Sequence, residues 1–186
     1  MRKTLFAILL ATLAAPFALS ASAQNDNPMV GGAPMYRSKN IVENAVNSAD
    51  HTTLVAAVKA AGLVETLSGK GPFTVFAPTN AAFDKLPAGT VQTLLMPENK
   101  AMLTKVLTYH VVAGKYDSQK LAQLIKKGGG EARLTTVSGG TLTARMNGMD
   151  GISLIDEKGG TSNVTTANVY QSNGVIHVVD TVLLPQ

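Results

Sequence analysis

Residues 74–83, TVFAPTNAAF, are the stretch that decides the fold. It opens with apolar, β-branched and aromatic residues, which are typical of a strand buried inside a sheet. Pro78 ends that strand, because proline has no N–H group to donate to a neighbouring strand. Thr79 and Asn80 follow, and both residue types cap the free N–H groups at the start of a helix. The stretch therefore predicts a central strand over 73–77 that leads directly into a helix, a structural joint rather than a catalytic turn.

Apolar residues at helical spacing surround this strand in the first two thirds of the chain. We expect a helix over 41–46 and a second helix that begins with Asp50 as its N-cap and ends at Gly62. Further helical segments are expected over 63–67, 90–95 and 98–107, and from a cap at Asp117 or Ser118 to the glycines at 128–130.

The pattern changes to strands after residue 131. Segments rich in Thr, Val and Ile are separated by turn sequences such as Asn147-Gly148 and Asn173-Gly174. The expected strands are 109–112, 133–137, 141–146, 152–156, 163–170 and 175–184. Helices first and a sheet last indicate an α+β domain rather than a doubly wound α/β domain.

The N-terminus has the pattern of a secretory signal peptide. Two basic residues precede an apolar run, and 21–23, ASA, form a small-residue cleavage site. The run is shorter than the ~20 residues of a membrane span, which argues against an uncleaved anchor. We therefore expect a signal peptide over 1–23, a flexible leader over 24–39 and a single domain over 40–186. After cleavage the protein would be periplasmic or extracellular, without a membrane anchor.

Charge and cysteine content exclude several classes of protein. Without Arg2 and Lys3, the chain carries 14 basic and 12 acidic side chains, a sum of +2. Lys126-Lys127 is the only adjacent basic pair beyond the signal peptide, and no basic run is interleaved with aromatic residues, so nucleic acid is not an expected partner. The chain has no cysteine, which rules out disulfides, zinc–thiolate sites and a cysteine nucleophile.

Candidate catalytic residues are sparse. His51, His110 and His177 are far apart in the sequence and lack metal-ligand spacing. We expect an exposed His51, and half-buried His110 and His177 that each make one hydrogen bond. Asp180 would point to the opposite face of a regular strand from His177, which weakens a His–Asp pair. No pattern marks a serine nucleophile or a phosphate-binding loop. A hydrolase using His110 or His177 stays as an alternative.

Three segments carry a resemblance to a known family. TVFAPTNAAF is similar to the first signature box of the fasciclin-like (FAS1) domain, and LTYHVVAGKY, at 107–116, resembles its central Tyr-His motif. NGVIHVVDTVLLP, at 173–185, resembles its second signature box. The boxes occur in the family order, and the resemblance covers residues 40–185.

The resemblance implies a wedge of mostly antiparallel strands flanked by a cluster of helices. It also implies a secreted, non-catalytic module for cell adhesion or for contact with proteins, polysaccharides or matrix, without a cofactor. The Tyr-His motif, linked to partner binding in some members, corresponds to Tyr109, His110, Val111 and Val112. The signature positions with an expected structural role are Thr74, Phe76, Pro78, Thr79, Asn80, Phe83, Asn173, Gly174, His177 and Asp180.

The alternative function is transport of an apolar small molecule. Some single-domain members of the family that this chain resembles carry carotenoids. The chain has several methionines beyond the signal peptide, and methionine is common at adaptable apolar surfaces. It has no tryptophan and few other aromatic residues to stack on a polyene.

Overall fold

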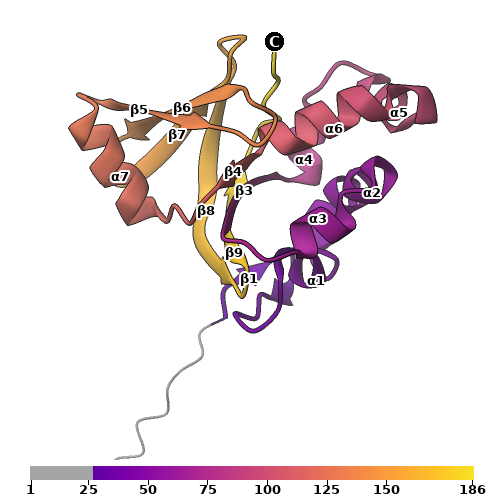
Figure 1. The fold of residues 1–186 in the computed structure, drawn as a ribbon, viewed down its shortest axis with the longest axis horizontal. Coiled ribbons are helices and arrows are strands. Elements are labelled where there is room, and N and C mark those ends of the chain that lie inside the picture. The colour runs from indigo at the N-terminus through magenta and orange to yellow at the C-terminus, as the bar shows by residue number, and fades with distance from the viewer. Residues whose placement is uncertain (1–26) are drawn as a thin grey trace, which may run out of the picture.

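The computed structural model describes residues 27–186, so the predicted signal peptide, 1–23, and the first part of the predicted leader lie outside the described residues. Most helices lie on one side of a long bent sheet, and α7 lies on the other side (Figure 1). The helical elements are α1 (Ile41–Ala45), η1 (Ala49–His51), α2 (Thr52–Ala61), α3 (Val64–Ser68), α4 (Asn80–Asp84), α5 (Thr90–Leu95), η2 (Pro97–Asn99), α6 (Lys100–Tyr109) and α7 (Ser118–Lys127). The strands are β1 (Met29–Val30), β2 (Ala33–Pro34), β3 (Phe73–Pro78), β4 (Val111–Ala113), β5 (Glu131–Thr135), β6 (Thr141–Asn147), β7 (Gly151–Ile155), β8 (Thr161–Gln171) and β9 (Gly174–Val179).

The main sheet has seven strands in the order β4-β3-β9-β8-β7-β6-β5. β3 and β9 run parallel, with Phe76 opposite His177, and the other neighbouring pairs are antiparallel. The predicted α+β class is therefore confirmed. β3 has a partner on each side, as expected for a central strand.

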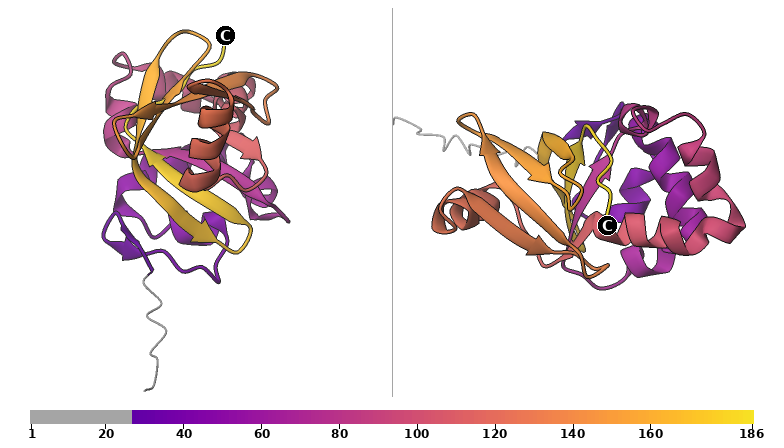
Figure 2. Two further views of the ribbon diagram at one scale, coloured as in Figure 1. Left: turned by 90° about the vertical axis from the view of Figure 1, so that its left-hand side faces the viewer. Right: turned by 90° about the horizontal axis from the view of Figure 1, so that it is seen from above.

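The sheet separates two hydrophobic cores. Figure 2 shows most helices on one side of the sheet and α7 on the other. Val75 and Ala77 of β3 pack into the core under α1–α6, whereas Phe76 between them packs into the core of α7 and β5–β7. Successive residues of a strand point to opposite faces, so β3 supplies both cores. A strand buried on both faces has no polar side, and this explains the near-continuous apolar run in the sequence.

The N-terminal segment differs from the flexible leader that was expected. β1 and β2 form a short hairpin, and Met35 after it is 2% exposed in the helix-side core. The Tyr36 N–H donates to Asn44 Oδ1 at 3.0 Å, and Asn44 Nδ2 donates to the Tyr36 carbonyl at 2.7 Å. The expectation is therefore wrong for residues 28–36, because the hairpin pairing, the burial of Met35 and the bonds of Tyr36 to Asn44 hold them in place.

Three boundaries of helices and strands also differ from those expected from the sequence. Asp50 is not the N-cap of α2; it lies within η1, and the helix begins after His51. Tyr109 ends α6 instead of opening a strand, and β9 ends at Val179 instead of continuing to 184.

Candidate functional site

Residues 74–83 supply caps to the first turns of two helices, α4 and α2. The Thr79 side chain accepts the Ala82 N–H at 3.2 Å and so caps α4, as predicted. Asn80 instead caps α2: its Oδ1 accepts the Thr53 N–H at 3.0 Å, and its Nδ2 donates to the Ala49 carbonyl at 2.9 Å. Asn80 therefore replaces the cap that was expected from Asp50. Phe83 packs into the helix-side core, as expected.

The start of the same strand is held by Thr74. Its hydroxyl donates to the Gly114 carbonyl at 2.7 Å and accepts the Tyr116 N–H at 2.9 Å. Thr74 is fully buried, and both bonds tie β3 to the loop that follows β4. A hydroxyl can donate and accept together, so the buried group is satisfied.

The second signature stretch begins with a tightly packed turn. Asn173 Oδ1 accepts the Ile41 N–H at 3.0 Å, and its Nδ2 donates to the carbonyls of Leu67 and Gly69. A Cβ on Gly174 would lie 2.1 Å from the Phe73 carbonyl oxygen, so only glycine lets β9 approach β3 at this point. Asn173 and Gly174 therefore hold the start of β9 against β3 and α1.

The Tyr109 side chain is fully buried, with an exposed fraction of 0%, in the core of α7 and β5–β7. Its hydroxyl donates to the Thr141 carbonyl at 2.7 Å and accepts the Glu157 N–H at 3.1 Å. Burial, followed by the effect of the nearby carboxylates, raises the pKa of Tyr109 to about 12. The side chain thus links α6 to β6 and to the turn after β7.

His110 is buried rather than half-buried as expected. Nδ1 lies 2.8 Å from the Val106 carbonyl and must donate to it, whereas Nε2 accepts the Leu183 N–H at 3.0 Å. Burial lowers the pKa of His110 to about 4, so the imidazole is neutral at neutral pH. Val111 and Val112 are buried as well, so a partner cannot touch this motif in the folded protein.

His177 is also fully buried, not half-buried. Its Nε2 donates to the Tyr116 carbonyl at 2.7 Å, and its ring stacks on Phe76 with 5.6 Å between centroids. Nδ1 lies 3.4 Å from the Asn168 N–H, and Asn168 adopts a positive φ of 62° at an irregular point of β8. Burial lowers the pKa of His177. Sequence reasoning missed Asn168, although asparagine tolerates this conformation better than most residues.

Asp180 does not pair with His177, in line with the expectation from strand geometry. Its Oδ1 accepts the Asn163 N–H at 2.8 Å, and its Oδ2 accepts the Asn163 Nδ2 at 3.0 Å. Lys85 lies 3.9 Å from the carboxylate. These bonds favour the ionised form and outweigh burial, so the pKa of Asp180 is lowered. Asp180 therefore joins the end of β9 to β8.

His51 is the largest departure among the histidines, because it is 3% exposed instead of lying at the surface. Its Nδ1 is 2.8 Å from the Ser48 hydroxyl, and its Nε2 makes no hydrogen bond within the described residues. Burial lowers the pKa of His51, although the Ala77 carbonyl and Asp50 oppose this in part. The hairpin of β1 and β2 lies beside this position, since the Gly31 carbonyl accepts the Ala49 N–H at 3.0 Å, and the sequence pattern did not indicate this contact.

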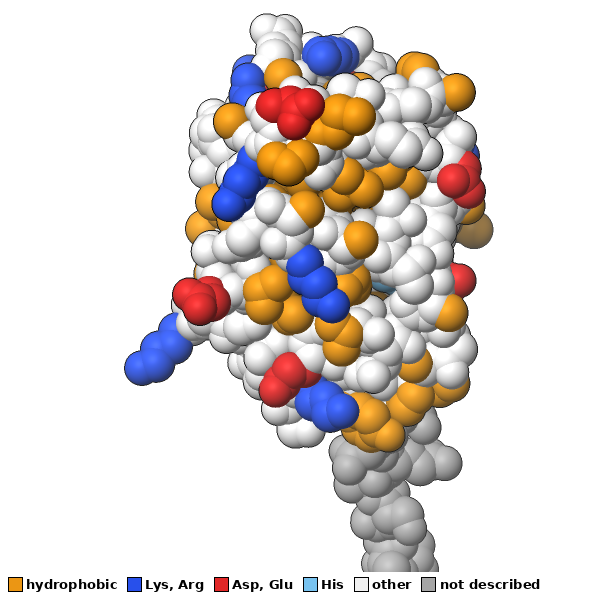
Figure 3. All heavy atoms as spheres, turned by 90° about the vertical axis from the view of Figure 1, so that its right-hand side faces the viewer, with side chains coloured by type: hydrophobic (Ala, Val, Ile, Leu, Met, Phe, Trp, Pro, Cys, Tyr) orange, Lys and Arg blue, Asp and Glu red, His pale blue; other side chains and the backbone are white. Residues whose placement is uncertain are grey.

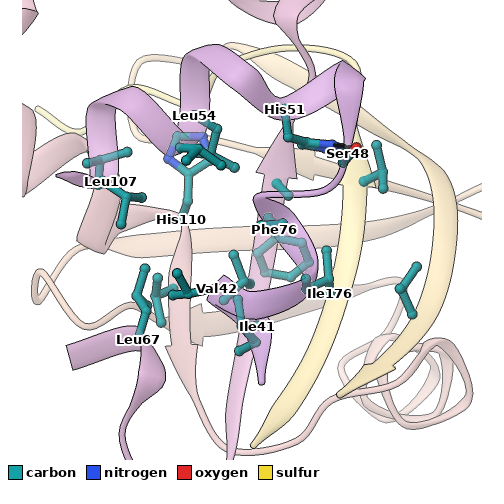
Figure 4. Close-up of a pocket in the computed structure, with 18 of the residues that line it drawn as sticks. Ile41, Val42, Ser48, His51, Leu54, Leu67, Phe76, Leu107, His110 and Ile176 are labelled. Atoms are coloured by element: carbon teal, nitrogen blue, oxygen red, sulfur yellow. Dashed lines mark hydrogen bonds between the residues drawn. The ribbon is translucent and has the colours of Figure 1, made fainter. Parts of the chain in front are cut away.

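An apolar cavity of about 60 Å³ lies between the helices and the sheet (Figure 4). Its walls come from α1, α2, α6, β3 and β9, and include Ile41, Leu54 and Ile176. Most of the lining side chains are aliphatic, and Phe76, Ser48, His51 and His110 line it as well. A volume of this size exceeds the roughly 10–15 Å³ that one water needs, but is far below the roughly 300 Å³ of a typical ligand pocket.

The outer face of the helices carries apolar side chains among scattered charges (Figure 3). Val46, Met96 and Met102 are the large exposed apolar side chains of this half. Across residues 27–186, no group of three or more His, Asp or Glu side chains is placed to hold a metal ion. None of the described helices combines the length and apolar character needed to cross a bilayer.

Comparison with known proteins agrees with this geometry. Residues 49–185 match the model of the Fasciclin domain family. Protein sll1483 of Synechocystis is 49% identical over 145 residues, which cover 78% of this chain and 73% of that protein. Immunogenic protein MPB70 of Mycobacterium bovis is 36% identical over 146 residues, which cover 76% of this chain and 66% of the relative.

A further relative and a solved structure with the same fold are longer than this chain. Cell surface glycolipoprotein MPB83 of Mycobacterium bovis is 36% identical over 123 residues, 66% of this chain and 48% of that protein. The solved FAS1 domain pair of the insect cell adhesion molecule Fasciclin I has a TM-score of 0.69 at 20% identity, covering 78% of this chain and 51% of the pair. This chain thus spans about half of each, and none of these relatives is named as an enzyme. From its family match and from these relatives, the chain belongs to the fasciclin (FAS1) domain family.

Proposed function

We propose that this protein is a non-catalytic contact module that acts in the periplasm or outside the cell, where it binds a protein or polysaccharide of the envelope or matrix. Membership of the fasciclin family carries this proposal, since one relative is named a cell surface protein and a solved structure with the same fold comes from an adhesion molecule. The signal-peptide pattern at the N-terminus supports export.

The bonds of the histidines also favour a non-catalytic role. His110 and His177 use their ring nitrogens to hold backbone groups of distant segments. The Ser48–His51 contact joins a serine to a histidine, but both side chains are buried and His51 Nε2 faces no carboxylate. A serine nucleophile needs an accessible oxygen and a histidine that a third group orients.

Deletion of the gene in the source organism tests the proposal. We expect weaker attachment of cells to surfaces or to one another, restored when the purified protein is added back. Unchanged attachment and biofilm formation under several growth conditions would overturn the proposal. Hydrolase assays with ester and amide substrates provide the complementary check, and they should give no activity above the uncatalysed rate.

Carriage of an apolar small molecule is the second candidate, and the apolar cavity favours it. Its volume of about 60 Å³ suits a molecule of a few heavy atoms, so a long polyene would require the helices to move away from the sheet. An absorption spectrum and a solvent extract of protein purified from its own host test this function. A visible band with one equivalent of an apolar compound would support carriage, and a colourless protein with an empty extract would exclude it.

A further inference from the structure

Five basic residues that are scattered through the sequence meet at one end of the fold. Arg37, Lys39, Lys70, Lys115 and Lys120 lie around the end of the sheet where β3 and β9 begin, the lower end in Figure 1. All five are exposed. We call this surface the basic face.

Tyrosine rings connect the members of the basic face. The Arg37 guanidinium and the Lys115 ammonium both lie over the ring of Tyr170, at 4.9 Å and 4.8 Å from its centroid. Lys120 lies 4.4 Å from the centroid of Tyr116, and its Nζ also donates to the Lys115 carbonyl at 3.3 Å. A ring positions a cation without neutralising its charge, so the N–H groups that point outward stay available to an anion.

Lys39 and Lys70 extend the basic face on its other side. The Lys39 ammonium lies 5.1 Å from the ring centroid of Tyr36, and the Lys39 carbonyl accepts the Ser172 N–H at 3.0 Å. Ser172 lines a surface groove of about 530 Å³ together with Lys70 and Lys115. The groove therefore joins the two halves of the basic face.

The lining of the groove is polar and rich in small residues. Serine hydroxyls and glycine backbone line it beside the two lysines, which leaves polar groups in reach of a ligand. The lining residues are Asn40, Ser68, Gly69, Lys70, Gly71, Pro72, Lys115, Gln171, Ser172, Asn173 and Gly174. Among the described residues, no protein atom accepts the N–H groups of Lys70 and Gly71.

The positive charge of this face is not balanced by ion pairs. In residues 27–186 the ion pairs are Lys85–Asp180 and Arg145–Glu131, and neither involves the basic face. Two carboxylates lie beside the face: Asp117 caps α7 through the Lys120 N–H, and Glu43 accepts the Asn40 N–H. Five cations against these two carboxylates leave the face with a net positive charge, which raises the local concentration of anions.

We propose that the basic face binds a carboxylate-bearing polysaccharide in this groove. The proposal rests on the contact function proposed above and assigns it a surface and a class of partner. A guanidinium can take a carboxylate through two parallel hydrogen bonds, and the lysines add point charges. The serines and free N–H groups in the groove match the hydroxyl groups of a sugar chain.

Single-stranded nucleic acid fits the same face less well. Binding of that kind relies on aromatic rings that are free to stack on bases. Here the cations of the basic face already lie over the rings of Tyr36, Tyr116 and Tyr170. Repeated uronate groups need charge and hydrogen bonds rather than free ring faces.

Affinity electrophoresis of the purified protein through gels that contain polygalacturonate tests the proposal. We expect retardation that weakens with added salt, and none with neutral dextran. The double variant Arg37→Gln/Lys115→Gln should lose about tenfold in affinity, since both partners of Tyr170 then lose their charge. The matched control Lys126→Gln/Lys127→Gln removes the same charge from the far end of α7 and should bind within about twofold of the original protein.

Several results would overturn the assignment. Equal loss in the two double variants would mean that net charge alone drives binding. Tighter binding to poly(dT) or to phosphatidylglycerol vesicles would assign the face to another class of partner. If the Arg37→Gln/Lys115→Gln variant still binds cells as the original protein does, the surface is wrong but the contact function stands.

Discussion

Tyr109 and His110 show why a motif tied to binding by resemblance has a structural task in this chain. Both side chains are buried, and their polar atoms hold the backbone of β6, the turn after β7 and the C-terminal segment. A partner cannot reach them unless the fold opens. Their link to binding stays a prediction, and any effect of changing them on binding would act through stability.

Replacing Tyr109 with phenylalanine tests this structural task. The variant keeps the ring but leaves the Thr141 carbonyl and the Glu157 N–H without their partner, so we expect a loss of about 1–3 kcal/mol in the free energy of unfolding. Tyr36→Phe is the matched control, because Tyr36 is exposed, and it should change stability by less than about 0.5 kcal/mol. Urea titration measures both, and equal effects would contradict the assignment.

The buried histidines predict that the protein loses stability in mild acid. His110 has a pKa of about 4 when folded, against about 6.5 in the unfolded chain, so below pH 6.5 the unfolded chain binds more protons. Stability is therefore full above pH 6.5 and falls as the pH drops towards 4. From His110 alone we expect about 2 kcal/mol less at pH 5 than at pH 8.

The pKa values of His51 and His177 are lowered as well, so they add to this loss in the same direction. Urea titrations over this pH range measure the total loss in the free energy of unfolding. An NMR titration of the His110 imidazole gives its pKa and therefore its contribution to that loss. An NMR pKa near 6.5 for His110, or stability that is flat between pH 8 and pH 5, would refute this prediction.

At the scale of elements, the sequence predicted what depends on local chemistry. The strand over 73–77, the Thr79 cap, the end of α2 at Gly62 and the start of α7 at Asp117 are confirmed, because each depends on neighbours in the chain. The side chain that accepts a free N–H group at the start of α2 could not be predicted in this way. Asn80, which supplies it, lies 27 positions beyond the N–H that it accepts.

Asn80→Ala should therefore destabilise α2 and not only α4. The change leaves the Thr53 N–H without its acceptor, and we expect a loss of about 1–2 kcal/mol. Asn47→Ala removes one exposed side-chain bond to the Glu43 carbonyl and should lose less than about 0.5 kcal/mol. Hydrogen exchange should speed up in the first turn of α2, and unchanged exchange there would show that Asn80 is not its cap.

The N-terminal segment was the element that sequence reasoning placed wrongly. Its glycines, proline and asparagines indicate a loop, and nothing local shows that Val30 and Met35 lie in a core. The same holds for His51, which the sequence placed at the surface and which is 3% exposed in the structure. Burial of a short segment depends on a surface built by residues much later in the chain.

A pair of methionines tests whether this segment belongs to the core. Met35→Ala should lower the free energy of unfolding by about 2–5 kcal/mol, because a side chain that is 2% exposed leaves a cavity. Met29→Ala, six residues earlier, changes a side chain that faces solvent at 62% exposure and should have little effect. If thermal or urea unfolding shows equally small losses of stability in both variants, this segment is a flexible leader and not part of the core.

At the scale of the whole molecule, the fold creates features that no stretch of sequence contains. The sequence has one adjacent basic pair after residue 3, yet the basic face gathers five cations from positions 37 to 120. The cavity likewise forms between helices and strands from both halves of the chain. Composition and motifs predicted the family and its fold, whereas these surfaces depend on how distant segments meet.

The most direct test of the contact function is a binding isotherm on cells. Fluorescently labelled protein is added to cells of its source organism that lack the gene, and bound label is measured against free protein. We expect saturable binding that excess unlabelled protein displaces. Absence of saturable binding, together with one equivalent of an apolar compound in the extract of native protein, would contradict the contact module and favour the carrier.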